Sequence, residues 1–263
     1  MLHSEVLRQL GFALQGIIPR TIDEIFNIIH REESKKESKI QHEIQVSYVE
    51  VYLSKVKDLL NPLNGKGNLR IRESFEKGIY VEGVTQKLVS STTEVHRAIS
   101  IGESNKIIGE GRNFASSILA LKVKQTDKET RVQRTSTVSF SDLAGLPRKY
   151  SKLSKKMDST LRRRQFETLS ALGQVLKALT QRIKHVPYRD LKLTRLLSDS
   201  IGGNAKTCIL VTASPAFLDM EKTLRSMRWG RRARLVTNNP KVDSSAATFE
   251  DAKRRAPPHA QAT

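Results

Sequence analysis

The most constraining feature of this chain is a nearly continuous run of structural signals between residues 169 and 236. LSALGQVLKALT has apolar residues at helical spacing, HVPYRD is a basic loop fixed by a proline, and LKLTRLL shows helical spacing again. The apolar run 208–213 then predicts a buried strand, and residues 219–236 predict a last helix. Because helices and a strand alternate with short connections, this region predicts a large part of one α/β domain.

Positive charge is concentrated in one stretch of the sequence. The 263 residues carry a formal net charge of +19. Residues 146–195 hold 14 Lys or Arg against 3 Asp or Glu, a net of +11, whereas residues 1–145 contribute +3 and residues 196–263 contribute +5. A generally basic soluble protein would spread its charge more evenly, so we expect one surface that binds an acidic partner.

Cysteine usage and hydropathy narrow the cellular setting. Cys208 is the only cysteine, so the sequence can form neither an internal disulfide nor a cysteine metal cluster. Residues 1–20 lack the pattern of a secretory leader, and no apolar run approaches the roughly 18 residues of a membrane span. We therefore expect a protein of the cytosol or nucleus without membrane contact.

The first part of the chain predicts a helix and then several strands. Thr21 and Glu24 have the spacing of a capping box at a helix start. The alternation of apolar residues in 40–53 predicts a strand covered on both faces, and residues 54–60 predict a short helix. Glycine-bounded apolar segments predict three more short strands, at 69–73, 78–83 and 85–89.

The middle of the chain delivers an acidic residue to the end of a strand. Ser91 and Glu94 repeat the capping-box spacing and predict a helix that reaches about residue 108. Strands are expected at about 117–125 and 132–141, followed by Asp142 and then Gly145. Open α/β sheets bind ligands at the carboxyl ends of their strands, so this turn is a candidate binding site.

Seven motifs, in this order, resemble those of the kinesin motor domain family: GIIPR, VSYVEVYLSKVKDLL, GIYVEGVT, DLAG, LSALG, HVPYRDLKLTRLL and GGNAKT. The resemblance implies an α/β fold of the P-loop NTPase type, with a central mixed β-sheet flanked by helices on both faces and incomplete at its N-terminus. It divides the chain into a non-family segment at 1–15, a partial motor domain at 16–242 and a disordered tail at 243–263. The implied activity is ATP-driven movement along microtubules in the cytoplasm, with ATP and Mg²⁺ as cofactors.

The phosphate-binding loop that such enzymes use does not occur in these 263 residues. Its pattern, G-x-x-x-x-G-K-[ST], turns backbone amides toward the phosphates and supplies a lysine and a Mg²⁺-binding hydroxyl. The sequence contains this pattern nowhere. Because the hydrolysis barrier is lowered mainly by positioned charge, the sequence predicts weak or absent ATP hydrolysis.

The resemblance also places remnants of two nucleotide-sensing switches. The family's first switch reads approximately N-x-x-S-S-R-S-H, which matches Asn113, Ser116 and Ser117, and both serines would face Mg²⁺ and the γ-phosphate. The second reads D-L-A-G-S-E, which matches Asp142 and Gly145. These five residues are the cofactor-binding candidates. Ser117 and Asp142 are the candidates for Mg²⁺, with Asp142 acting through a bound water.

Both switches depart from the family at the residues that close the site. The arginine and glutamate that pair across the family's site are replaced here by Ile118 and Pro147. Replacing both partners with apolar groups removes the penalty of a stranded charge together with the interaction. We therefore assign no catalytic residue. Ser116, Ser117 and Asp142 also fit the plainer interpretation of polar residues at strand ends.

The resemblance places the microtubule-binding face on the segment that carries the net charge of +11. Microtubules are strongly acidic, so the family match and the charge distribution indicate the same surface. The matching residues are Lys152, Lys155, Lys156, Arg162, Arg163, Arg164, Lys184, His185, Tyr188, Arg189, Lys192 and Arg195.

Two other functions stay open. The Lys/Arg excess also suits nucleic-acid phosphates, although no nucleic-acid module is recognisable and aromatic residues, which stack on bases, make up only 5% of the chain. The alternative is a non-functional motor fragment of marginal stability. In the family a strand precedes the phosphate loop, and without it the neighbouring strands keep unpaired backbone groups. Residues 6–14 suit that strand or a helix equally well.

Overall fold

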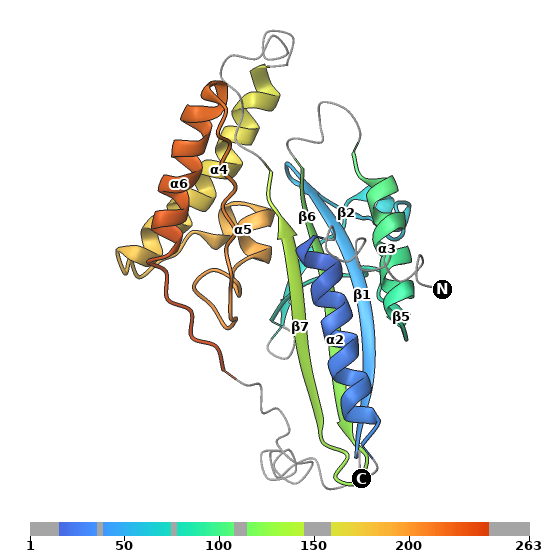
Figure 1. Cartoon of the computed structure of the whole chain (residues 1–263). Helices are drawn as coiled ribbons and strands as arrows, with labels where there is room; N and C mark the ends of the chain where they lie inside the picture. The colour runs from blue at the N-terminus through green and yellow to red at the C-terminus, as the bar shows by residue number, and fades with distance from the viewer. Residues whose placement is uncertain (1–15, 36–38, 75–77, 108–114, 145–158, 242–263) are drawn as a thin grey trace, which may run out of the picture.

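The computed structural model describes residues 16–35, 39–74, 78–107, 115–144 and 159–241, except for the side chains of 159–169. The predicted non-family segment at 1–15, the predicted tail at 243–263, and the candidate site residues Asn113, Gly145, Lys152, Lys155 and Lys156 lie outside these ranges. Residues 16–144 form a long twisted sheet with its covering helices, which we name the sheet half (Figure 1). Residues 159–241 form a group of helices beside it, which we name the helical half (Figure 1).

The sheet is built around one long strand. β1 (Ile40–Tyr52) lies between β2 (Lys55–Asp58) and β6 (Ala115–Asp127), and β7 (Gln133–Asp142) pairs with the far side of β6. β5 (Lys87–Val89) pairs with an earlier part of β1, while β3 (Ile71–Ser74) and β4 (Gly78–Val81) form a separate two-stranded sheet. Every strand pair among the described residues is antiparallel.

Helices cover both faces of β1, as the sequence predicted. Ile44, Val46 and Tyr48 are buried in one apolar cluster together with residues of α2 (Ile17–Glu33) and α3 (Thr92–Asn105). Val49 and Val51 are buried in a second cluster on the other side, with residues of α4 (Ser159–Thr180) and α5 (Lys192–Leu196). The change of face along a single strand therefore holds the two halves of the molecule together.

One of the two predicted capping boxes is confirmed and the other is wrong. At α3 the Glu94 N–H donates to the Ser91 hydroxyl, while the Glu94 carboxylate accepts from the Ser90 N–H at 2.7 Å. α2 instead begins at Ile17, and the Thr21 hydroxyl donates to the Ile17 carbonyl from within the helix. Pro19 is tolerated there because a first-turn residue needs no intrahelical N–H bond.

The short helix expected at 54–60 is wrong. Leu53, at φ 55°, reverses the chain immediately after β1, and Lys55–Asp58 pair with β1 as strand β2. Hairpin turns favour positive φ, and this local geometry decides against a helix. The three short strands expected after it are confirmed as β3, β4 and β5, with the 3₁₀ turn η1 (Asn64–Gly67) before β3.

The buried strand expected at 208–213 is also wrong. These residues pair with no described strand, and the side chain of Leu210 is 67% exposed. An apolar sequence forms a stable strand only when its backbone groups are paired and its faces are covered, and the described residues supply neither. The helix expected after it is confirmed as α6 (Met220–Ala233), which follows the 3₁₀ turn η5 (Phe217–Asp219).

Among the described residues, no helix has the length and apolar character needed to cross a lipid bilayer.

Candidate functional site

The sheet brings the two switch remnants together at the end of β7. Ser117 lies opposite Asp142 in the pairing of β6 with β7, and opposite Glu50 in the pairing of β6 with β1. The antiparallel turn between β6 and β7 therefore places two residues 25 positions apart in the sequence side by side. Asn113 and Gly145, the other two switch positions, lie outside the described residues.

Ser116 and Ser117 point to opposite faces of the sheet, because successive side chains alternate along a strand. The Ser116 hydroxyl accepts a hydrogen bond from the Ala144 N–H at 3.0 Å, which ties the start of β6 to the DLAG turn. Ser117 instead lies opposite Glu50 on the face where Tyr48 is buried against α3. The two hydroxyls therefore lie on opposite faces of the sheet, and no single ion on one face contacts both.

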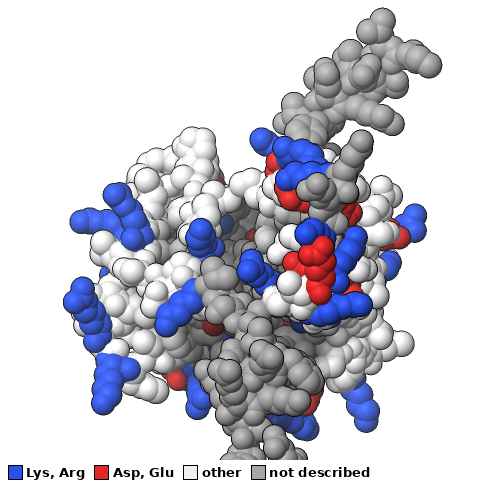
Figure 2. Space-filling model, turned by 90° about the horizontal axis from the view of Figure 1, so that it is seen from below, with Lys and Arg blue, Asp and Glu red and all other residues white. Residues whose placement is uncertain are grey.

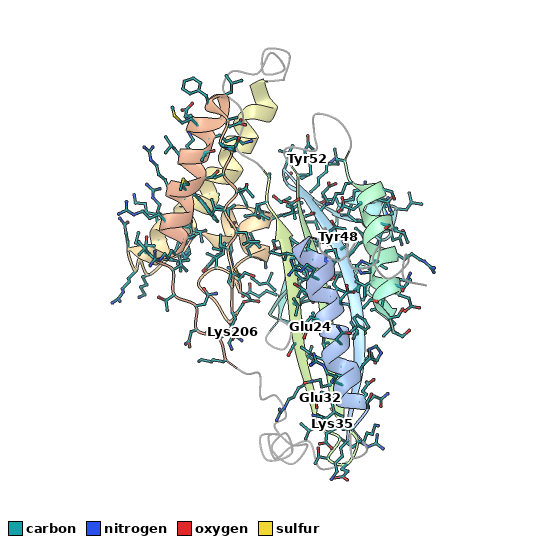
Figure 3. All side chains as sticks on the ribbon, viewed as in Figure 1. Glu24, Glu32, Lys35, Tyr48, Tyr52 and Lys206 are labelled. Atoms are coloured by element: carbon teal, nitrogen blue, oxygen red, sulfur yellow. The ribbon has the colours of Figure 1, made fainter. Side chains whose placement is uncertain are left out.

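Tyr48 is the centre of a polar cluster beneath α3 (Figure 3). Its hydroxyl donates to Glu103 Oε1 at 2.5 Å, and the same oxygen accepts from Lys106 Nζ at 2.6 Å. Burial raises the pKa of Tyr48, and its hydrogen bond to Glu103 raises it further. Burial opposes the charge of Lys106, but its bonds to Glu103 and Tyr48 outweigh this and raise the pKa of Lys106. Both groups therefore stay protonated at neutral pH.

A buried carboxylate holds the end of α3. Glu50 is 1% exposed, and the Ile107 N–H donates to both of its carboxylate oxygens, at 3.2 and 3.3 Å. Ile107 is the last described residue before the segment that contains Asn113. Sequence reasoning missed Glu50, Tyr48 and Lys106, although the alternation along 40–53 already placed a carboxylate in a strand buried on both faces.

These residues do not fit a tight Mg²⁺–triphosphate site. Ser117 and Asp142 offer oxygen atoms suited to Mg²⁺, but the Ser116 hydroxyl lies on the other face and accepts from the Ala144 N–H, and Lys106 pairs with Glu103. Among the described residues, no group of three or more His, Cys, Asp or Glu side chains is placed to hold a metal ion. We therefore derive no chemical step through a bound nucleotide.

The second candidate site is the basic loop between α4 and α5. Lys184 and His185 are exposed, and Arg189 in the 3₁₀ turn η4 (Tyr188–Asp190) has a side chain that is 81% exposed. Seen from below, the helical half shows Lys and Arg with few acidic side chains, whereas the sheet half mixes both signs (Figure 2). The exposed part of this loop is therefore able to meet an acidic surface.

Three other predicted contact residues hold the loop in place. The Tyr188 hydroxyl donates to the Ile201 carbonyl at 2.5 Å. Lys192 Nζ donates to Asn68 Oδ1 at 3.0 Å, and burial lowers the pKa of Lys192. Arg195 donates to the Ile71 carbonyl at 3.4 Å and lies 3.5 Å from Glu73. Lys192 and Arg195 thus attach α5 to the β3 region, and Tyr188 ties the loop to Ile201, so the three side chains position the surface more than they extend it.

The remaining predicted contacts divide by what the structure describes. Arg162, Arg163 and Arg164 lie on the first turns of α4, for which only the backbone is described. Lys152, Lys155 and Lys156 lie outside the described residues.

Sequence reasoning missed three further basic residues. Lys177 and Arg232 line an open hollow of about 410 Å³ together with Thr180 and Gln181, and Arg182 is exposed at the end of α4. Lys177 and Arg182 belong to the segment with the net charge of +11, so the charge count contained this signal although the family motif did not.

Comparisons with known proteins agree with this arrangement. The family model of the kinesin motor domain matches residues 10–236. Kinesin-related protein 5 of Dictyostelium discoideum is 37% identical over 243 residues, covering 89% of this chain and 24% of that protein. The kinesin heavy chain of Drosophila melanogaster is 38% identical over 248 residues, covering 92% of this chain and 25% of that protein.

A solved structure supports the fold as well as the sequence match. The structure of a fast kinesin superposes with a TM-score of 0.77 at 32% identity, covering 90% of this chain and 68% of that one. The chain thus spans about a quarter of the length of the curated relatives named above. With the motifs, the fold and the family model in agreement, the chain belongs to the kinesin motor-domain family.

Proposed function

We propose that this chain binds microtubules through the exposed basic loop between α4 and α5, and that it hydrolyses ATP weakly or not at all. Kinesins are microtubule-based motors that bind ATP with Mg²⁺ and act in the cytoplasm on the cytoskeleton. For this chain we expect the family's partner, the microtubule, and its location in the cytoplasm, but not its ATP hydrolysis.

The observation that carries the binding proposal is that some side chains of this loop fix its backbone while others beside them are exposed to solvent. Tyr188, Lys192 and Arg195 are engaged with the protein itself, whereas Lys184 and His185 are exposed beside them. Arg189 pairs with Glu73 but keeps 81% of its side chain exposed. A fixed backbone that presents exposed basic side chains costs little to order on binding, which favours docking onto an acidic surface.

The weak-hydrolysis proposal has support from two independent features. The 263 residues contain no phosphate-binding loop, and apolar Ile118 and Pro147 occupy the positions at which the family's closing ion pair forms. The Ser116 hydroxyl also accepts a hydrogen bond from the Ala144 N–H. Transition-state charge on a phosphoryl group therefore finds few donors near Asp142.

Cosedimentation with polymerised tubulin tests the binding proposal. The variant Arg182→Glu/Lys184→Glu reverses two exposed charges in the loop, and Lys55→Glu/Lys128→Glu makes the same net change on exposed residues of the sheet half. We expect the loop variant to bind at least about tenfold more weakly and the control to change affinity less than about threefold. Equal losses in the two variants would show that net charge alone drives binding.

Two further arms test partner and chemistry. A salt-matched DNA shift assay should show weaker retention than tubulin does, and stronger retention on DNA would favour the nucleic-acid alternative. ATP turnover should stay at background with or without microtubules. Turnover that polymerised tubulin accelerates would contradict the weak-hydrolysis proposal.

A further inference from the structure

Two of the backbone edges that lack strand partners among the described residues are long and uncharged at their centres. One is the outer edge of β7, which pairs with β6 on its other side only. The other is the extended segment 208–213, none of whose N–H or C=O groups bonds to a described backbone group. An unpaired edge is a template on which another extended segment pairs.

Among the described residues, the outer edge of β7 has little of the usual protection against pairing. β7 is ten residues long, and its stretch from Thr135 to Ser141 contains no charged residue and no proline. Natural edge strands are usually short, or carry charges, prolines or bulges that prevent pairing. The composition of β7 is instead that of a strand with neighbours on both sides.

The segment 208–213 presents the second edge together with exposed apolar side chains. It rises from Lys206, labelled in Figure 3, along the side of the α4–α6 pair that faces β7 in Figure 1. Val211 packs against α6, since a Cβ on Gly230 would lie 2.6 Å from its Cγ2 atom. Ile209 and Leu210 remain 38% and 67% exposed. An apolar segment that is held in place but left uncovered lacks its normal neighbour.

Both edges border the same apolar cluster. Leu143, immediately after β7, and Trp229 of α6 both pack against the cluster that contains α4 residues and Ala233 of α6. α6 in turn carries Val211 on its surface. One extended segment placed between β7 and 208–213 would therefore gain backbone bonds on its flanks and apolar contacts from this cluster.

We propose that residues 6–14, VLRQLGFAL, dock as an extended segment between β7 and residues 208–213. Nine residues at about 3.3 Å each span about 30 Å, which matches the ten residues of β7. Leu10, Phe12 and Leu14 fall on one side at period 2, with Gly11 and Ala13 on the other. Fifteen residues precede Gly16 and reach at most about 50 Å, which is enough to cross the sheet from α2.

Cys208 supplies the probe for this proposal, because it is the only cysteine and is exposed at one end of the segment. Single cysteines placed along residues 9–14 of the full chain are allowed to form disulfides with Cys208 under mild oxidation. Neighbouring strands bring Cβ atoms to about 4.5–5.5 Å, within reach of a disulfide. Ser4→Cys is the matched control, and Cys208→Ser removes the acceptor thiol.

Docking predicts that the intramolecular disulfide forms fastest at one position of the segment, the one beside Cys208, and slower at the positions one residue to either side, whose side chains point to the opposite face. At the fastest position it should form on the order of 100-fold faster than with Ser4→Cys, because docking raises the effective concentration of the thiol. Equal rates along the segment, or fast positions spaced by three or four residues, would overturn the proposal. Disulfides between two chains, formed at a rate that rises with protein concentration, would also overturn it. They would show that a second copy of the chain occupies the space between β7 and residues 208–213.

Hydrogen exchange on the full chain provides a second readout that needs no cysteine chemistry. Leu10→Asp/Phe12→Asp should speed amide exchange in 209–213 and β7 at least about tenfold, with the centre of β1 unchanged. If 209–213 exchange at the rate of an unprotected peptide in the unmodified chain, the segment has no partner and the proposal fails. Neither experiment uses microtubules or nucleotide, so both are independent of the proposed function.

Discussion

The sheet half and the helical half of this molecule differ in how completely they are paired and in how they are charged. In the sheet half, β1 has neighbours on both sides, and residues 1–145 carry a net charge of only +3. In the helical half, 208–213 lacks described partners, and nine of the sixteen large apolar side chains that are exposed among the described residues lie between residues 209 and 235. The sheet half is therefore the more completely paired part of the molecule, whereas the helical half leaves apolar side chains exposed.

The largest expected effect comes from emptying the two cores on either side of β1. Leu121 and Leu176 are both 0% exposed, the first in the cluster under α2 and α3, the second in the cluster under α4. Replacing either with alanine should lower the unfolding free energy by about 2–5 kcal/mol. Thermal unfolding followed by circular dichroism and by Trp229 fluorescence measures the loss in each half.

The sheet half and the helical half should unfold together in one cooperative transition. Because β1 contributes side chains to both clusters, we expect one transition in both signals. A Leu176→Ala protein that loses only the fluorescence transition would show that the halves are separate folding units.

Two helical glycines, one in each half, differ in the space available for a side chain. A Cβ on Gly102 in α3 would lie 2.1 Å from the Tyr48 ring, whereas a Cβ on Gly173 in α4 meets nothing within 4 Å. Gly102→Ala should destabilise the protein by about 1–3 kcal/mol through overpacking. Gly173→Ala should stabilise it by about 0.5–1 kcal/mol, because alanine suits a helix interior better. Urea titrations of both variants measure the difference, and a neutral Gly102→Ala would mean that Tyr48 moves freely.

The sequence predicted the sheet half better than the helical half, for a physical reason. The two-faced burial of β1 and the cap at Ser91 follow from local spacing, and both are confirmed. The strand expected at 208–213 was inferred from an apolar run alone. Whether such a run becomes a strand depends on partners distant in the sequence, and the described residues provide none.

The candidate sites show the same limit. Charge counting indicated the basic segment, but only the structure separates exposed Lys184 from Lys192, which bonds to Asn68. Motif matching placed Ser116 and Ser117 together, and the alternation of the strand then sends them to opposite faces. A sequence motif identifies candidate residues, but it does not show which of their side chains are already bonded within the folded protein.

Alkaline pH should weaken the cluster that anchors α3 to the sheet. The pKa values of Tyr48 and Lys106 are both raised above their ordinary values of 10.0 and 10.5. Folding thus favours their protonated forms, a contribution that is complete below about pH 10 and lost as pH rises through the folded-state values. Tyr48→Phe should lower stability by about 1 kcal/mol at pH 7 and flatten its decline above pH 10. An unchanged alkaline slope would show that other groups control it.

The smallest expected effect concerns the ion pairs that join the two halves. Among the described residues, Glu73 of β3 is the carboxylate that pairs across the halves, with Arg189 at 3.2 Å and Arg195 at 3.5 Å. Because Glu73 is 47% exposed, Glu73→Gln should cost less than about 1 kcal/mol of stability. Freeing Arg189 should raise affinity for polymerised tubulin about two- to threefold at low salt.

Glu82→Gln is the matched control for this last change, because Glu82 is 48% exposed and pairs with Arg72 inside the sheet half. It alters net charge equally but frees no cation of the basic loop. If both variants raise affinity alike, only the total charge matters to tubulin. If Glu73→Gln alone lowers the free energy of unfolding by more than about 2 kcal/mol, these exposed pairs hold the halves together, and β1 is not the main connection between them.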